Sequence, residues 1–452
     1  MIFARQALLP EGWGENVRLT LAGSSIETVT CDTVAQAADI CVDTALPALG
    51  NLHSHAFQRA MAGLTEYRSA GRDSFWSWRS LMYRFLEHLT PEDMQAIAAQ
   101  VYLEMQEAGY ASVGEFHYVH HQPGGGVYDN LAQTSLGIFE AARETGIGLT
   151  HLPVLYTYGG ADRAALGGGQ LRFGNDPERF QRLLEGAARG LASLPKDARL
   201  GLAPHSLRAV DPEGLALARE MRPKDPIHIH IAEQPAEVEQ IQNWLGARPV
   251  DWLLDNAPVD ARWCLIHATH MTDAETVAMA RSGAVAGLCP ITEANLGDGP
   301  FNGPAYLGAG GVFGIGSDSN VRISMTEELR MLEYSQRLRD LSRNVLTEEG
   351  GSVGETLYRG AALGGAQALG REAGAIRPGA LADIVAIDNT AASLSTVPQE
   401  RLLDGLVFAA GDVVVTDLWS AGRHSVKQGR HIDRHRITTR FTSTIRALAS
   451  RL

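Results

Sequence analysis

The sequence predicts an α/β protein: a (β/α)8 TIM-like barrel with a small β domain built from the N- and C-terminal segments. Eight short apolar segments recur over roughly 270 residues, and amphipathic segments that open with helix-start signals lie between them. Nearly continuous apolar runs are typical of parallel strands buried on both faces, and eight such strand and helix units indicate a barrel. Apolar segments separated by turn residues near both ends predict the second domain.

The eight predicted barrel strands are rich in Val, Ile, Leu, Ala and Gly. They span residues 45–53, 112–118, 148–156, 200–205, 226–231, 263–267, 284–289 and 312–316. A doubly wound open sheet is the alternative arrangement. That fold usually has a glycine-rich phosphate turn after its first strand, and no such turn follows residue 53.

Two helices between these strands have clear start signals. Thr90 precedes Pro91 and two acidic residues, a pattern that predicts a helix to about Ala108. Thr272 and Glu275 have capping-box spacing at the start of another helix.

The small β domain is expected to comprise residues 1–46 and 376–452, and the barrel residues 47–375. The segments that predict its strands are 17–21, 26–29, 382–387, 412–416 and 419–425. Between the third and fourth barrel strands, residues 159–169 include five glycines and predict a flexible loop. A lid over a site and a surface excursion without a role are equally compatible with this loop.

Composition and charge exclude several classes of protein. The 452 residues carry 39 basic and 52 acidic side chains, so the net charge is −13 and opposes binding to nucleic acid or an anionic membrane. The four cysteines have no CxxC spacing, which indicates reduced residues of a cytoplasmic protein. No signal peptide is evident and no apolar run approaches 18 residues.

Four motifs with metal-binding side chains end predicted strands one, five, six and eight. They carry His53 and His55, then His230, then His267, and finally Asp318. Each histidine or aspartate alone could be a structural hydrogen-bonding residue. Together they lie at the carboxyl ends of barrel strands, where barrel enzymes place their active sites. Three of these imidazoles together with the Asp318 carboxylate form a ligand set that predicts a divalent metal ion, either zinc or ferrous iron.

The same motifs predict hydrolytic removal of nitrogen from an amidine or a heterocycle. One divalent ion lowers the pKa of a bound water and yields a hydroxide that attacks an sp² carbon. Asp318 can accept the proton of that water, and Glu233, just beyond strand five, can protonate the leaving nitrogen. His267 can hydrogen-bond the nucleophile as a neutral imidazole.

Arginines near the predicted site indicate an anionic substrate. Arg208 follows strand four, and Arg79 lies after strand one in an aromatic segment. Gln58 and Tyr118 are also near strand ends. Because guanidinium groups bind carboxylates bidentately, two of them at one mouth favour a small dicarboxylate. Each arginine alone could equally form a structural ion pair, and the aromatic segment 75–78 could be helix core.

The motifs resemble those of the amidohydrolase superfamily. The HxH at His53 and His55 matches the superfamily pattern, as do His230, His267 and Asp318. Residues 380–388 (ALADIVAID) resemble the return of such chains into their small β domain. Members with two metals bridge them with a carboxylated lysine after strand four. None of the three lysines lies there, so the resemblance implies a single metal ion.

Within this superfamily the chain resembles the formimidoylglutamate deiminase family. The resemblance runs to about Gly422 and rests on seven segments: 51–64 (NLHSHAFQRAMAGL), 73–83 (DSFWSWRSLMY), 115–121 (EFHYVHH), 205–210 (HSLRAV), 228–234 (HIHIAEQ), 263–270 (WCLIHATH) and 293–299 (EANLGDG). It implies conversion of N-formimino-L-glutamate and water into N-formyl-L-glutamate and ammonia during histidine degradation.

The resemblance also implies roles for individual residues. The metal, most simply Zn²⁺ with Fe²⁺ as the alternative, would be held by His53, His55, His230 and Asp318, with Glu233, His267 and Asp318 as catalytic residues. The glutamyl part would be held by Gln58, Arg79, Tyr118, His205 and Arg208. Relatives of this barrel commonly form homodimers, which implies a dimer here. Nothing is carried over onto the tail after Arg430.

Three other functions remain open from the sequence. A deaminase of a purine, pyrimidine or triazine ring would use the same metal site without the arginines. An amide-ring hydrolase, such as the imidazolone-propionate enzyme, would release no ammonia. A non-catalytic metal-binding or scaffolding protein is disfavoured by the four strand-end motifs with Glu233.

Overall fold

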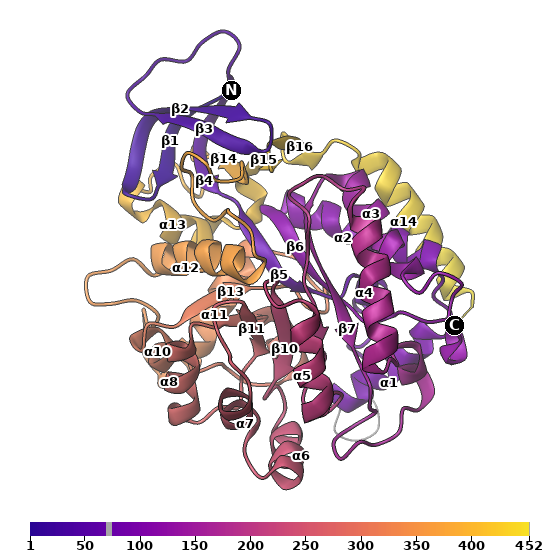
Figure 1. Cartoon of the computed structure of the whole chain (residues 1–452). Coiled ribbons are helices and arrows are strands. Elements are labelled where there is room, and N and C mark those ends of the chain that lie inside the picture. The colour runs from indigo at the N-terminus through magenta and orange to yellow at the C-terminus, as the bar shows by residue number, and fades with distance from the viewer. Residues whose placement is uncertain (69–74, 452) are drawn as a thin grey trace.

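The computed structural model describes residues 1–68 and 75–451, and side chains in 1–68 and 78–451. Two parallel sheets lie at the centre of the main body, with most of the helices around them, and a third sheet lies at one end (Figure 1). The parallel strands are β5 (Leu49–Ser54), β6 (Tyr110–His117), β7 (Gly148–Leu155), β8 (Arg199–Leu200) and β9 (Ala203–Pro204) in one sheet, and β10 (Ile227–Ile231), β11 (Trp263–His267), β12 (Val285–Leu288) and β13 (Val312–Ile315) in the other.

These strands lie within or overlap the eight predicted segments, with two differences. Residues 45–47 of the first segment belong to β4 (Ile40–Pro47) of the third sheet, and the fourth segment is divided into β8 and β9. Neighbouring strands are parallel throughout both sheets. Two single bridges connect the sheets: Leu202 pairs with Ile227, and Ser54 pairs with Asp318. The carboxyl ends of β5 and β13 are therefore neighbours.

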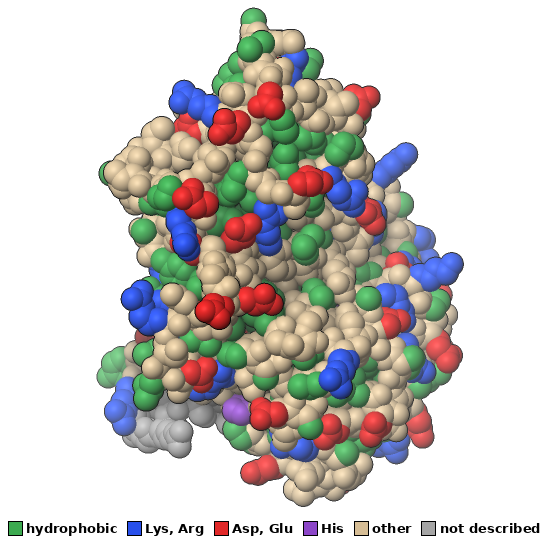
Figure 2. Space-filling view, turned by 90° about the vertical axis from the view of Figure 1, so that its left-hand side faces the viewer, with side chains coloured by type: hydrophobic (Ala, Val, Ile, Leu, Met, Phe, Trp, Pro, Cys, Tyr) green, Lys and Arg blue, Asp and Glu red, His purple; other side chains and the backbone are tan. Residues whose placement is uncertain are grey.

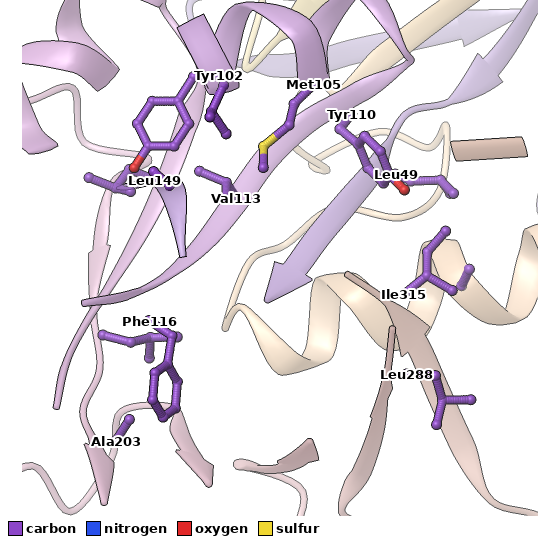
Figure 3. Close-up of a cluster of buried hydrophobic side chains, with 14 of the residues drawn as sticks. Leu49, Tyr102, Met105, Tyr110, Val113, Phe116, Leu149, Ala203, Leu288 and Ile315 are labelled. Atoms are coloured by element: carbon purple, nitrogen blue, oxygen red, sulfur yellow. The ribbon is translucent and has the colours of Figure 1, made fainter. Parts of the chain in front are cut away.

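Helices follow most of the parallel strands. They are α1 (Phe75–Leu86), α2 (Pro91–Glu107), α3 (Gln133–Thr145), α4 (Pro177–Leu191), α5 (Pro212–Met221), α6 (Pro235–Leu245), α7 (Pro249–Asn256), α8 (Asp273–Ser282), α9 (Pro290–Leu296), α10 (Gly303–Gly308), α11 (Met325–Asp340) and α12 (Val353–Ala368). Both predicted starts are confirmed, because Thr90 and Thr272 each form a capping box. In the core, Tyr102 and Met105 of α2 lie near Val113 of β6 (Figure 3).

Helix α12 packs closely against two of the parallel strands, β5 and β13. A Cβ at Gly364 of α12 would lie 1.9 Å from the carbonyl oxygen of Phe313 in β13, so only glycine permits this approach. Nearby, a Cβ at Gly365 would lie 2.9 Å from the carbonyl oxygen of Gly50 in β5. Helix α12 thereby packs against the two strands whose ends carry His53 and Asp318.

The third sheet contains strands from both ends of the chain. Its order is β17 (Arg430–His431), β16 (Arg423–Lys427), β15 (Val415–Ser420), β14 (Ile384–Ile387), β4 (Ile40–Pro47), β1 (Ile2–Leu9), β2 (Gly12–Ala22) and β3 (Ser25–Thr30). Two predicted strands had wrong bounds. Residues 412–414 form a 3₁₀ turn in which Asp412 accepts from the backbone and hydroxyl of Thr326. The segment 419–425 is divided by a turn at Ala421 and Gly422, which have φ of 44° and 78°.

The C-terminal tail, for which the sequence predicted no role, forms helix α14 (Arg434–Ala449) and packs against α2 and α3 (Figure 1). Arg434 pairs with Glu107 of α2, and Arg436 and Arg440 pair with Glu144 of α3. These ion pairs attach the end of the chain to its main body. The short helix α13 (Leu402–Gly405) lies between β14 and β15.

A buried charge network joins the third sheet to the parallel strands. Arg371 pairs with Asp197, which precedes β8, and with Asp383, which precedes β14. Arg423 of β16 adds two hydrogen bonds of 2.8 Å to Asp197. Burial opposes ionisation of Asp197, but Arg423 and Arg371 hold its pKa below the ordinary value. Ionised Asp197 therefore stabilises the fold at pH values above its ordinary pKa. This contribution is lost as the pH falls through the lowered pKa of the folded protein.

Replacement of Arg371 by Met is expected to lower the free energy of unfolding by about 3–5 kcal/mol, because it leaves buried carboxylates without their partner. Denaturant unfolding would measure the loss. The matched control is Arg377→Met, whose side chain is 49% exposed and pairs with Glu372 at the surface; that change is expected to cost less than about 1 kcal/mol. Equal losses in the two variants would contradict the role given to the network.

The surface carries mixed charge. On the face in Figure 2, acidic and basic side chains are interspersed and neither sign forms a continuous field. None of the described helices has the length and apolar character needed to cross a membrane.

Candidate metal and substrate site

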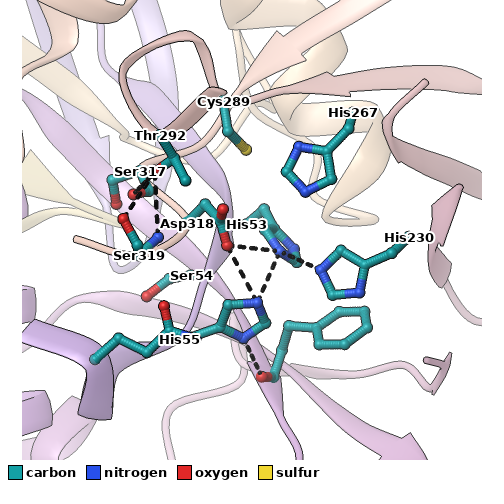
Figure 4. Close-up of polar contacts among 12 residues, drawn as sticks. His53, Ser54, His55, His230, His267, Cys289, Thr292, Ser317, Asp318 and Ser319 are labelled. Carbon is teal, nitrogen blue, oxygen red and sulfur yellow. Dashed lines mark hydrogen bonds and ion pairs between the residues drawn. The ribbon is translucent and has the colours of Figure 1, made fainter. Parts of the chain in front are cut away.

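Four predicted metal-binding side chains converge at the carboxyl ends of the parallel strands (Figure 4). His53 ends β5 with His55 just beyond it, His230 lies in β10, and Asp318 follows β13. One ligand atom from each of the four lies within 4.8 Å of the others. The side chains come from three separate segments of the chain, and all four are buried.

The imidazoles approach one another through their Nε2 atoms. His53 Nε2 lies 3.2 Å from His55 Nε2 and 3.0 Å from His230 Nε2. Asp318 Oδ1 lies 3.4 Å from His53 Nε2 and 3.2 Å from His55 Nε2. Three nitrogens and one carboxylate oxygen therefore face a common point.

This donor set fits a cation. His55 Nδ1 lies 3.0 Å from the carbonyl oxygen of Phe116, and His230 Nδ1 lies 3.2 Å from that of His205. Because a carbonyl oxygen only accepts hydrogen bonds, both Nδ1 atoms carry the proton and both Nε2 atoms present lone pairs. A single proton on His53 Nε2 could satisfy only one of these two lone pairs. A cation among the four groups would remove the remaining repulsion and use every lone pair.

Burial keeps these ligands in the protonation states that metals require. It lowers the pKa of His53 to about 3 and that of His230 well below the ordinary histidine value. For Asp318 burial acts in the opposite direction, but the adjacent His53 and His55 rings hold its pKa well below the ordinary value. Neutral imidazoles and an ionised carboxylate are thus present together.

Backbone contacts place Asp318 beside the HxH segment. Asp318 N donates to His53 O and His55 N donates to Asp318 O, both at 2.9 Å. A Cβ at Gly316 would lie 2.8 Å from backbone atoms of His53, so glycine is needed where the strands meet. Asp318 and His267 have φ of 43° and 70°. Non-glycine residues in this strained region are characteristic of functional sites.

His267 lies between two carboxylates. Its Nδ1 is 3.3 Å from Glu293 Oε1, and its Nε2 is 3.8 Å from Glu233 Oε1. Burial disfavours the charged ring, but Glu233, Glu293 and Asp318 together raise the pKa of His267 to about 10. The contacts with Glu293 and Glu233 favour donation by both ring nitrogens, and the sequence did not reveal that these carboxylates flank His267.

Further acidic groups surround Glu233. Burial raises the pKa of Glu233, with Glu237 and Asp318 adding to the shift and His267 opposing it. Asp298, in the loop after α9, accepts a hydrogen bond from Gln234. Burial and the charge of Glu233 raise the pKa of Asp298 to about 9. A carboxyl whose pKa is raised above its ordinary value can hold a proton and deliver it to a substrate, which suits general acid–base chemistry.

A second cluster of possible ligands shares Asp318. His267, Cys289 and Asp318 also have ligand atoms within 4.8 Å of one another. Burial raises the pKa of the Cys289 thiol well above its ordinary value, and His267 is held as a cation. Both conditions disfavour metal binding. The first set, with the three imidazoles of His53, His55 and His230, is therefore the better cation site.

Two supporting groups were missed by sequence reasoning. Asn51 of β5 exchanges hydrogen bonds with Ser317 after β13, at 2.7 and 3.1 Å. Glu115 of β6 accepts from the backbone of Ala56 at 2.9 Å, and burial raises its pKa to about 7. Both fix the segment that carries the HxH. Single polar residues within apolar strands gave no local signal of this role.

A pocket that is open to solvent lies beside the four convergent ligands. All five predicted substrate-binding residues line it: Gln58, Arg79, Tyr118, His205 and Arg208. The predicted metal-binding and catalytic residues His55, His230, Glu233, His267 and Asp318 also line it. Apolar and aromatic side chains complete the wall: Trp78, Met82, Tyr83, Tyr156, Phe173 and Leu296. Residues 73 and 74 of the predicted aromatic segment lie outside the described residues.

Arg208 is the clearest anion-binding group in the pocket. Only 7% of the residue is exposed, and its buried Nε has no hydrogen-bond partner. Among the described residues, none forms a hydrogen bond or ion pair with this guanidinium. Because an unpaired buried charge is costly, Arg208 is suited to an anion that enters the pocket.

Arg79 lies on α1 and is held by phenol groups. Its Nε donates to Tyr83 at 2.5 Å and its Nη2 donates to Tyr156 at 3.2 Å. Gln58 Nε2 donates to Tyr118 at 2.8 Å, while Gln58 Oε1 is buried without a partner. Burial, together with the charges of Arg208 and Arg79, lowers the pKa of His205 well below the ordinary value and keeps it neutral.

Comparison with known proteins agrees with this geometry. The amidohydrolase family model matches residues 44–424, and the N-terminal domain model of formimidoylglutamate deiminase HutF matches residues 1–41. The formimidoylglutamate deiminase of Pseudomonas aeruginosa is 48% identical over 98% of both chains. The chain belongs to the formimidoylglutamate deiminase family of amidohydrolases. It is accordingly a hydrolase that acts on carbon–nitrogen bonds.

Solved structures and a further relative share this fold. A crystal structure of an amidohydrolase from Brucella melitensis superposes with a TM-score of 0.94 at 49% identity, over 99% of each chain. An adenosine deaminase from Xanthomonas campestris with bound zinc superposes with a TM-score of 0.82 at 20% identity, over 99% of this chain and 98% of that one. A 5-methylthioadenosine/S-adenosylhomocysteine deaminase from Natronomonas pharaonis is 26% identical over 82% of this chain and 81% of its own. Formimidoylglutamate deiminases thus share an architecture with ring deaminases.

Proposed function

We propose that the protein hydrolyses N-formimino-L-glutamate to N-formyl-L-glutamate and ammonia. The observation that carries this proposal is the buried, unpartnered Arg208 in the same pocket as the convergent His and Asp ligands. The Pseudomonas aeruginosa relative supplies the substrate's name. A flat neutral ring would leave the guanidinium unpaired, whereas a glutamyl carboxylate would neutralise it.

The metal would be a single divalent ion, most simply zinc, held by His53, His55, His230 and Asp318. The zinc in the related adenosine deaminase structure supports this choice. When bound, such an ion supplies a Lewis acid that activates water near neutral pH.

Glu233, His267 and Asp318 would move and hold protons during the reaction. Water oxygen bonds to the formimino carbon, and the bond from that carbon to the terminal nitrogen breaks. Both protons of the water end on the terminal nitrogen, which leaves as ammonia. Asp318 accepts one of them and passes it on, and Glu233 takes the other from the attacking oxygen and donates it to the nitrogen, so both carboxyl groups return to their starting states. His267, held by Glu293, donates a hydrogen bond towards negative charge that develops on the attacking oxygen.

Gln58, Arg79, Tyr118, His205 and Arg208 would orient the glutamyl part. The two guanidinium groups bind carboxylates, and the amide and hydroxyl groups complete the polar wall. Holding both carboxylates fixes the formimino carbon beside the metal ligands, which is the main benefit of such a clamp.

The test of this reaction is product analysis in oxygen-18 water with metal-replete protein. Cleavage of the terminal carbon–nitrogen bond should yield ammonia and N-formyl-L-glutamate with one labelled formyl oxygen. Formamide with L-glutamate would show that the other carbon–nitrogen bond breaks, and would contradict the proposed reaction.

The metal ligands predict a loss of bound metal on mutation. His230→Ala removes one of three imidazole nitrogens and is expected to lower the zinc content of purified protein from one ion per chain to a small fraction. Elemental analysis by mass spectrometry measures this without any activity assay. His435→Ala, at an exposed position of α14, is the control. Full zinc occupancy in the His230 variant would exclude His230 as a ligand.

We further propose that the two parallel sheets are halves of one closed (β/α)8 barrel. The Leu202–Ile227 and Ser54–Asp318 bridges support closure at both seams. In this arrangement residues 47–375 form the barrel, and residues 1–46 and 376–452 the small β domain. An experimental structure with an open gap between β13 and β5 would contradict it.

We also propose a homodimer formed through α11. Leu338 is 79% exposed, and Tyr334, one turn earlier in α11, is 38% exposed. Leu341, which directly follows the helix, is 92% exposed. Large exposed apolar groups close together are typical of interaction surfaces. Light scattering should show a dimer for the wild type and a monomer after Leu338→Glu with Leu341→Glu. A monomeric wild type would contradict the proposal.

A further inference from the structure

Tyr156, at the end of β7, lies against the two predicted carboxylate-binding groups Arg79 and His205. Its hydroxyl oxygen accepts from Arg79 Nη2 and from Gln170 Nε2, both at 3.2 Å. Its ring lies 4.6 Å from the ring of His205. The residue is 2% exposed and lines the pocket.

The orientation of the Gln170 amide is fixed by backbone groups. Its Nε2 also donates to Gly159 O at 2.9 Å, and its Oε1 accepts from Gly167 N at 3.1 Å. A carbonyl oxygen cannot donate and a backbone N–H cannot accept, so the amide cannot be reversed. Gln170 is therefore a donor to Tyr156.

Both acceptor positions of the Tyr156 oxygen are thus used, and its own proton must be donated elsewhere. A phenol hydroxyl has two lone pairs and one proton. Among the described residues, no acceptor forms a hydrogen bond with that proton. Because the residue lines the pocket, an acceptor on a bound molecule is the remaining partner.

We propose that Tyr156 donates its hydroxyl proton directly to a carboxylate of the bound substrate, beside Arg79 and Arg208. The proposal rests on the proposed function, since it assigns one more contact to the same dicarboxylate. Arg79 and Gln170 both donate to the Tyr156 oxygen, which polarises its O–H bond and strengthens its donation to an anion. Gln170 is a positioning residue, because it acts on the substrate only through Tyr156.

The loop that contains residues 159–169 acquires a role from these contacts. Gln170 closes the loop onto Gly159, and a Cβ at Gly169 would lie 2.6 Å from the ring of Tyr83. Arg172 donates to the carbonyl oxygen of Leu86 at the end of α1. The loop therefore packs against the helix that carries Arg79, and it supports the side of the pocket that Arg79 and Tyr83 form.

Tyr156→Phe is the decisive variant because it removes only the hydroxyl and keeps the ring against His205. We expect kcat/KM for N-formimino-L-glutamate to fall by about 10- to 100-fold, mainly through KM, as for loss of a hydrogen bond to a charged group. The matched control is Tyr158→Phe. The Tyr158 hydroxyl donates to Asp211, outside the pocket lining, and its loss is expected to change kcat/KM less than about twofold. A wild-type kcat/KM in Tyr156→Phe would overturn the proposal.

Substrate analogues test whether the hydroxyl acts at a carboxylate. Analogues with the α- or the γ-carboxylate replaced by a carboxamide should respond differently to Tyr156→Phe. The loss should be smaller for the analogue that lacks the contacted carboxylate. Equal losses for the parent and both analogues would show that the hydroxyl acts at neither carboxylate, and would overturn the proposal.

A double-mutant cycle tests Gln170. Gln170→Ala should raise KM in the wild-type background and have little further effect in Tyr156→Phe, because its action passes through the hydroxyl. Additive effects of the two changes on KM would overturn the positioning role.

A binding measurement distinguishes this proposal from the proposed reaction. Calorimetry with N-formyl-L-glutamate needs no turnover, and Tyr156→Phe should weaken its binding by about 10- to 100-fold. If the wild type binds this compound but releases no ammonia from N-formimino-L-glutamate, the proposed reaction fails while weaker binding by the variant still supports the hydroxyl contact. Absence of binding to the wild type would overturn both.

Discussion

Glu233→Gln is expected to retain its metal and to lose about 10²- to 10⁴-fold in kcat, the usual contribution of a general acid or base. The amide keeps the size of the side chain but cannot deliver a proton to the leaving nitrogen. Glu233 is buried in the pocket, and its Oε1 is 3.8 Å from His267 Nε2. Burial raises its pKa, which favours the protonated form that can donate to the leaving nitrogen.

The measurement is kcat for ammonia release, with zinc content determined on the same preparation. Glu239→Gln, an exposed neighbour on α6, is the control and should behave as the wild type. Turnover within tenfold of the wild type in Glu233→Gln would remove Glu233 from the proton pathway. Loss of zinc in the variant would instead assign it a role in metal binding.

Arg208→Met is expected to lower kcat/KM for N-formimino-L-glutamate by about 10²- to 10³-fold, mainly by raising KM, because the substrate carboxylate would lose its buried charged partner. The guanidinium has no competing partner among the described residues, so the variant leaves no protein carboxylate unpaired. Arg208→Lys should recover only part of the loss, since an ammonium cannot form the two parallel hydrogen bonds of a guanidinium.

Steady-state kinetics on both variants, with Arg182→Met as control, measure this effect. Arg182 is 56% exposed and pairs with Glu178 at the surface of α4. An unchanged kcat/KM in Arg208→Met would show that the carboxylate clamp is wrong, even if the metal chemistry is right.

Much of the fold was predictable because its strands are buried on both faces. Segments such as 263–267 and 148–155 are mostly apolar and are buried along their whole length, so no periodicity had to be resolved. The wrong bounds lie in the small sheet, where tertiary contacts decide. Asp412 is held in a turn by Thr326, which is 86 residues away in the sequence. No local pattern contains that information.

The metal ligands were predictable because side chains at the ends of parallel strands meet at one edge. The spacing of His53 and His55 places two imidazoles together without knowledge of the fold. The groups around them were less accessible. Glu293 was seen as part of a motif but without a role, since its contact with His267 spans 26 residues. The hydrogen bonds that direct the Tyr156 hydroxyl depend on a loop with no motif.

The roles of the two arginines in the pocket could not be settled from the sequence. Arg79 and Arg208 could each have formed a surface ion pair, and residue type does not distinguish the two cases. The structure distinguishes them because Arg208 is buried and its Nε has no partner. An unpartnered buried charge has a physical meaning that an arginine in a sequence lacks.

The most direct test of the account is ammonia release by purified, metal-replete protein from N-formimino-L-glutamate, with guanine, cytosine and S-adenosylhomocysteine in parallel. The account predicts rapid release from N-formimino-L-glutamate alone, abolished by a chelator and restored by zinc or ferrous iron. Release from a ring substrate with none from N-formimino-L-glutamate would keep the metal site and contradict the dicarboxylate pocket.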